Sequence, residues 1–158
     1  MKYLPLFACF TLPLAAVDSV VTFNEISYNP KGANQDQEWI EVYNQMAINV
    51  DLSGWKLTGG ADFTFPNGTT IPGGGYFLIA KNPGNPDLAG LNVVGPFSGS
   101  LSNGGETLRL RSQSNRLMDE VDYADSGKWP VGPDGSGATL AKASGNLLSG
   151  KSSSWRTS

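Results

Sequence analysis

The chain has 158 residues, a formal net charge of −3, no histidine and a single cysteine, Cys9. Without histidine it cannot form a Ser-His-Asp or Cys-His catalytic relay, and a zinc site built from histidine and cysteine is excluded as well. Its 11 lysines and arginines form no cluster, so we do not expect this acidic chain to bind nucleic acid.

The N-terminus, residues 1–16, has the layout of a secretory signal peptide. Lys2 is followed by an apolar run over 3–14 and then by two alanines. A transmembrane helix needs about 20 apolar residues, so we expect no membrane span. We expect 1–16 to be removed and the mature protein to be extracellular, free or at the cell surface. Removal takes away Lys2 and Cys9, which changes the charge from −3 to −4 and leaves no cysteine for a disulfide.

The rest of the chain is predicted to consist of β-strands. Its 20 glycines and ten prolines recur along the chain, and no segment keeps a 3.6-residue apolar period. Helices are therefore not expected, and a bulge is expected near Asn24 and Glu25, where the alternation of the first strand changes parity. The clearest predicted strands cover 20–28, 38–44, 54–58, 76–80, 107–111, 117–123 and 138–141.

Two of these strands show which side chains face the core. In 38–44, Ile40 and Val42 alternate with Trp39, Glu41 and Tyr43, so the aliphatic pair should face inward. In 117–123, one side carries Leu117, Asp119, Val121 and Tyr123, and Met118, Glu120 and Asp122 take the other. Trp55 is expected in the core, and Trp155 is expected to fold back and tie down the C-terminus.

Seven short motifs follow one another in a fixed order: Asn24-Glu25-Ile26, Glu38-Trp39-Ile40-Glu41-Val42-Tyr43-Asn44, Asp51-Leu52-Ser53-Gly54-Trp55, Phe65-Pro66, Ile71-Pro72-Gly73-Gly74-Gly75-Tyr76, Leu101-Ser102-Asn103-Gly104-Gly105-Glu106 and Ser154-Trp155-Arg156. Together they resemble the lamin tail domain. The resemblance implies one domain over 20–158, an all-β, immunoglobulin-like β-sandwich of about eight or nine short strands.

The resemblance also implies a kind of function. Relatives on secreted bacterial proteins stand beside hydrolase, nuclease or adhesive domains and are thought to serve attachment or spacing. We therefore expect a secreted, non-enzymatic module that binds an unidentified protein or a component of the cell envelope or matrix. The alternatives are a calcium-stabilised structural spacer and, less favoured, a hydrolase that uses carboxylates.

Four residues are the candidates for a binding surface: Trp39, Glu41, Tyr43 and Trp129. The first three form an aromatic-acid-aromatic row on the outer side of one strand, and aromatic side chains supply much of the energy of contact surfaces. Trp129 lies in a loop rich in glycine and proline, where it could equally pin its own loop.

Acidic residues gather in two segments of the sequence, and calcium prefers oxygen ligands of this kind. The candidate ligands are Asp36, Glu38, Glu120 and Asp122. The same side chains could instead form solvated strand faces, and a pair of carboxylates could in principle cleave a glycoside. No loop has the regular spacing of a calcium-binding loop, so calcium is the only cofactor considered and no other is expected.

Overall fold

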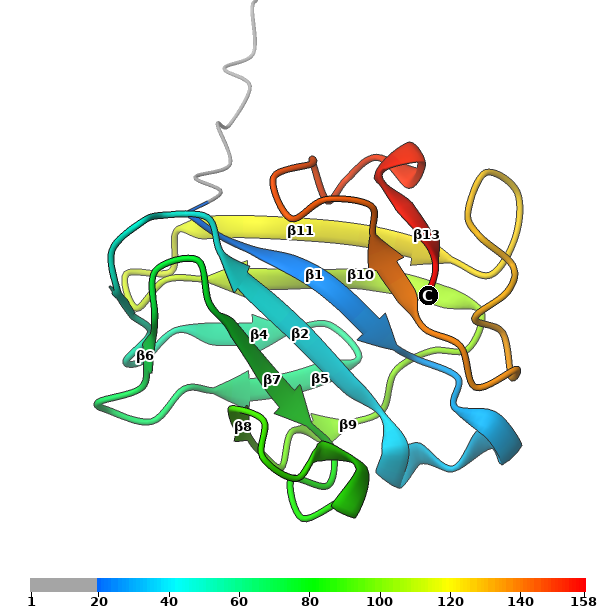
Figure 1. Cartoon of the computed structure of the whole chain (residues 1–158), viewed down its shortest axis with the longest axis horizontal. Coiled ribbons are helices and arrows are strands. Elements are labelled where there is room, and N and C mark those ends of the chain that lie inside the picture. The colour runs from blue at the N-terminus through cyan, green and yellow to red at the C-terminus, as the bar shows by residue number, and fades with distance from the viewer. Residues whose placement is uncertain (1–19) are drawn as a thin grey trace, which may run out of the picture.

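The structure, a computed structural model, describes residues 20–158, so the predicted signal peptide lies outside the described residues. Two sheets are stacked face to face, and their strands cross at an angle in Figure 1. The front sheet has six strands in the order β13 (Trp155–Thr157), β12 (Leu140–Lys142), β1 (Val21–Ser27), β2 (Trp39–Asn44), β7 (Tyr76–Ala80) and β8 (Val93–Val94). Among the strand pairs of the described residues, only β7–β8 is parallel.

The second sheet has five strands in the order β11 (Leu117–Ala124), β10 (Gly105–Arg111), β4 (Lys56–Thr58), β5 (Ala61–Thr64) and β9 (Ser98–Gly99). A small pair, β3 (Val50–Asp51) and β6 (Thr70–Ile71), stands at one end of the sandwich (Figure 1). Four of the thirteen strands, β3, β6, β8 and β9, have only two residues, which leaves nine longer ones. The predicted all-β sandwich of eight or nine strands is therefore confirmed.

Helical structure within 20–158 is limited to four short 3-10 turns: η1 (Lys31–Ala33), η2 (Gln35–Gln37), η3 (Pro86–Leu88) and η4 (Ser152–Ser154). None of the helices in this part of the chain has the length and apolar character needed to cross a membrane. Frequent glycine and proline residues interrupt any helical segment, as the sequence predicts.

The hydrophobic core lies between the two sheets. Ile40 and Val42 of β2 are fully buried there, in one cluster with Leu108 and Leu110 of β10. Trp55 belongs to this core, as predicted, and Trp155 folds back into the same core. The expected bulge is present as well, because the register of β1 against β2 shifts between Phe23 and Glu25.

The prediction for Met118 is wrong. A bulge shifts the register of β11 against β10, so that Asp119 pairs with Leu110 while Leu117 pairs with Arg111. Met118 has no partner at this point and turns into the core, where it is only 5% exposed. A strict alternation drawn from the sequence cannot show such an insertion.

The outer face of β7 is covered by the chain that follows it. Leu78 and Ala80 form a second small apolar cluster with Leu88 of η3, and Trp39 and Val93 pack against that cluster. β7 is therefore buried on both faces, which explains why it is the most apolar strand. The same cover supports one side of the Trp39 indole.

A buried lysine ties the C-terminal part of the chain to the front sheet. Lys142 Nζ donates to the carbonyl oxygens of Gly145 at 3.0 Å and Leu147 at 2.9 Å and to Thr22 Oγ1 at 3.1 Å, and it lies 3.3 Å from Ser149 Oγ. Ser149 Oγ in turn donates to Asp119 Oδ2 at 2.6 Å. This Lys142 network holds the segment that leads from β12 to β13.

Candidate functional site

A groove of about 470 Å³ opens at the end of the front sheet where β1 finishes and β2 begins. Three stretches that are distant in sequence meet around it: the end of β1 with the connection to β2, the turn η3, and the chain before β12. We call it the Trp39 groove. It is lined by Ser27, Pro30, Lys31, Gln37, Trp39, Asn85, Asp87, Leu88, Ser136, Gly137 and Thr139.

Two short turns, each capped by an asparagine side chain, position the edges of the groove. Asn34 Oδ1 accepts a hydrogen bond from the backbone N–H of Asp36 at 3.2 Å, which caps η2 just before Gln37. Asn85 Oδ1 accepts from the backbone N–H of Asp87 at 3.0 Å and caps η3, whose first residue is a proline. Asparagine is among the best capping residues and proline suits the first helical position, so local sequence fixes both turns.

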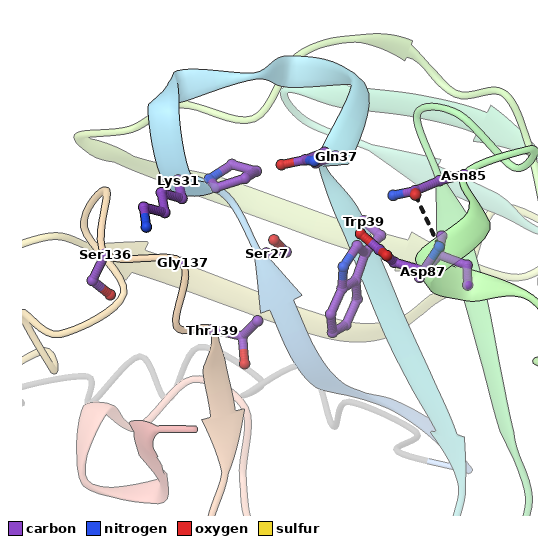
Figure 2. Close-up of a pocket in the computed structure, with 11 residues that line it drawn as sticks. Ser27, Lys31, Gln37, Trp39, Asn85, Asp87, Ser136, Gly137 and Thr139 are labelled. Carbon is purple, nitrogen blue, oxygen red and sulfur yellow. Dashed lines mark hydrogen bonds between the residues drawn. The ribbon is translucent and has the colours of Figure 1, made fainter.

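Trp39 stands in the middle of the groove. Figure 2 shows its indole with Ser27 and Thr139 across from one side and Asn85 and Asp87 on the other. The ring packs against the apolar cluster that contains Leu88, and the residue as a whole is half-buried. The groove therefore offers a fixed, partly accessible aromatic surface.

Several polar side chains around the indole have no partner in the fold. Within 20–158, the side chains of Ser27, Lys31, Gln37 and Asp87 make no hydrogen bond or ion pair. Thr139 differs, because its hydroxyl donates to a carboxylate oxygen of Glu25. The groove thus combines an apolar ring with donors and acceptors that are free to bind a ligand.

The other three candidate binding residues lie outside the groove. Glu41 Oε1 accepts a hydrogen bond from Asn24 Nδ2 at 2.7 Å; burial raises the pKa of Glu41, and the nearby Glu25 adds to the rise. The Tyr43 ring lies 4.8 Å from the ring of Tyr76.

Trp129 packs against the core, with its ring 6.1 Å from that of Trp155. The aromatic-acid-aromatic row predicted from strand alternation therefore does not form one binding surface. Trp39 faces the groove, while Glu41 and Tyr43 have partners within the protein.

The four candidate calcium ligands are not brought together. Asp36 is exposed on η2, whereas Glu38 is buried and its Oε2 accepts from the backbone N–H of Leu101 at 2.9 Å. On the other sheet, Glu120 pairs with Arg109 Nε at 2.7 Å and Asp122 accepts from Thr107 Oγ1 at 2.6 Å. Within the described part of the chain, no three His, Cys, Asp or Glu residues are grouped so that they could hold a metal ion.

Burial also raises the pKa of Glu38, although the Leu101 N–H and the charge of Lys81 oppose the rise. The cause is the cost of placing a charge away from water. Glu38 therefore has a structural role: its carboxylate binds the backbone of the segment before β10.

Sequence reasoning identified Trp39 but missed the rest of the groove. The two Asn-x-Asp turns at 34–36 and 85–87 were the available signals, since such turns fix the position of the residue that follows. No spacing in the sequence shows that they lie beside Trp39 and Thr139.

Comparison with known proteins gives a family. The lamin tail domain matches residues 15–125, which is more than half of the chain. No significant match was found among curated proteins. β12 and β13 follow the matched range, yet they continue the front sheet beyond β1, and Ser136 and Thr139 line the groove. The chain belongs to the lamin tail domain family.

Proposed function

We propose that the protein is a secreted, non-enzymatic lamin-tail module that attaches to a component of the cell envelope or extracellular matrix through the Trp39 groove. The single observation that carries this proposal is the half-buried indole of Trp39 surrounded by polar side chains without internal partners. Aromatic side chains in partly desolvated pockets are the usual anchors of binding sites. The signal-peptide layout of 1–16 supports export.

The acidic residues of the fold support a non-catalytic role. Of the carboxylates in the described part of the chain, only that of Asp87 lines the groove. Glycoside cleavage by carboxylates needs two of them, about 5–10 Å apart on either side of the bond. Glu38 and Asp119, whose pKa values are raised by burial, accept backbone N–H groups and hold the fold together.

The test is retention of purified mature protein on isolated cell envelopes or matrix. Trp39→Ala should remove most of the retention, because it removes the aromatic surface of the groove. Tyr76→Ala is the matched control, since Tyr76 is an exposed aromatic residue that does not line the groove.

Equal retention of the parent and of folded Trp39→Ala would show that attachment uses another surface. Turnover of a glycan, phosphoester or peptide by the purified protein would contradict the non-enzymatic role. N-terminal sequencing of exported protein should give Val17, and an intact Met1 would contradict the predicted signal peptide.

A further inference from the structure

We infer that the ligand of the Trp39 groove is a neutral saccharide, a short stretch of a polysaccharide chain. This inference rests on the proposed attachment function and assigns the chemical class of the ligand. Its basis is the match between the groove and a sugar ring, which presents C–H groups on its faces and hydroxyl groups around its edge.

The indole matches the face of the sugar. Trp39 is held on one side by the cluster of Leu78, Ala80 and Leu88, so the ring keeps its position when the groove is empty. A large apolar face with little freedom to lose favours stacking with another flat surface. The ring stands inside the groove in Figure 2, where the narrow cross-section of a sugar chain can reach it.

The free polar groups match the edge of the sugar. Ser27 and Gln37 can each donate and accept a hydrogen bond, Asp87 accepts and Lys31 donates. A sugar hydroxyl does both, so it can pair with any of these groups. A purely apolar ligand would instead desolvate them without giving partners, which is unfavourable.

The charges of the groove exclude several other ligands. Among residues 20–158, Lys31 and Asp87 are the only charged residues that line it, and their charges cancel. A nucleic acid or another polyanion would need an excess of positive charge. The balance therefore favours a ligand without net charge.

A peptide that binds by strand addition is a poorer match, because its backbone would need a free strand edge. β2 is paired on both sides, and Trp39 itself pairs with Ser27 of β1 and with Ala80 of β7, so the strand that carries the indole offers no unpaired edge. The volume of about 470 Å³ lies in the range typical of small-ligand sites, roughly 300–1,000 Å³. It suits a few sugar units.

The experiment is isothermal titration calorimetry of the mature protein with cellohexaose, chitohexaose, xylohexaose and mannohexaose. At least one of these neutral oligosaccharides should bind. Trp39→Ala should weaken binding at least about tenfold, and Gln37→Ala and Asp87→Ala should each weaken it by about two- to tenfold. Tyr76→Ala should leave the affinity unchanged.

Gln37→Ala and Asp87→Ala keep the inference testable if Trp39→Ala does not fold, because neither side chain has a bonding partner within the described residues. Their melting temperatures should equal that of the parent. Absence of binding to every oligosaccharide up to about 10 mM, or equal binding by the parent and all three groove variants, would overturn the inference.

The two proposals can fail separately. Loss of envelope retention in Trp39→Ala, without binding of any oligosaccharide to the parent, would leave the attachment function in place and reject the saccharide. Binding of peptides from a proteolysed envelope at the groove would reject it in the same way. Saccharide binding together with full retention of Trp39→Ala would instead reject the attachment function.

Discussion

Replacing Lys142 with methionine tests whether a buried charge organises the C-terminal part of the fold. Lys142 is 4% exposed, and its ammonium donates to the carbonyl oxygens of Gly145 and Leu147 and to Thr22 Oγ1. Methionine has a similar shape but no donor, so these acceptors lose their partner and the buried Asp119 loses a nearby positive charge. Breaking one side of a buried polar network costs about 3 kcal/mol.

A loss of that size should lower the melting temperature by about 10 °C in a domain of this length. Urea unfolding at pH 7 measures the free energy directly. Lys151→Met is the matched control, because Lys151 is an exposed lysine of the same segment. If Lys142→Met unfolds within about 0.5 kcal/mol of Lys151→Met, the Lys142 network does not stabilise the fold.

The pH dependence of stability provides a second test of the environment of Lys142. Burial lowers the pKa of Lys142 to about 8 from 10.5, with Asp119 opposing the shift. Between those values the unfolded chain binds a proton that the folded chain releases, so the free energy of unfolding should rise with pH. The expected rise from pH 7 to pH 9.5 is about 2 kcal/mol.

The rise should be absent in Lys142→Met. Measurements stay below pH 10, because burial raises the pKa of Tyr28 to about 12 and also raises that of Tyr123. Above pH 10 the unfolded chain loses tyrosine protons that the folded chain retains, so stability should fall there. A parent protein whose stability does not increase between pH 8 and pH 9.5 would contradict the assigned environment of Lys142.

Three further predictions concern the core and the carboxylates. Trp55→Ala should destabilise the protein by about 3–5 kcal/mol in urea, because a large core side chain is removed; a loss below about 1 kcal/mol would contradict its core position. Burial raises the pKa values of Glu38, Glu41 and Asp119, so these carboxylates bind protons more tightly in the folded state. Stability should therefore increase as the pH falls from 7 toward about 4.5. A decrease in melting temperature over that range would be inconsistent with their burial. Gly145→Ala should destabilise the protein by about 1–3 kcal/mol, because the added Cβ would lie 2.6 Å from Cδ1 of Tyr43. Gly150→Ala is the control and should cost much less, because the space around Gly150 is open. Equal unfolding free energies of the two variants would contradict this packing.

Much of the fold could be predicted because several local patterns agree with it. The alternation of Ile40 and Val42 with Trp39 and Tyr43 reflects a strand with one face on the core, and the same parity is present in β2. The parity change near Glu25 marked the bulge in β1. The bulge in β11 could not be predicted, because it depends on how β11 pairs with β10 and leaves no local mark around Met118.

The candidate site could be predicted only in part. Trp39 was identifiable as an outward aromatic residue on a strand. Gln37, Asp87 and Thr139 come from separate connections, and only the packing of η3 over β7 and the pairing of β12 with β1 bring them to the same indole. Clustering of acidic residues along the sequence was misleading, since Glu38 lies just before β2 of the front sheet and Glu120 lies on β11 of the second sheet.

The most direct test of attachment through the Trp39 groove is nuclear magnetic resonance of nitrogen-labelled mature protein mixed with soluble fragments of cell envelope or matrix. The chain has four tryptophans, so its indole N–H signals are few and can be assigned by single substitutions. Binding in the Trp39 groove should shift the Trp39 indole signal and the backbone signals of Ser27, Gln37 and Asp87 together. Shifts confined to Trp129 or to strands outside the groove, or none at all, would contradict it.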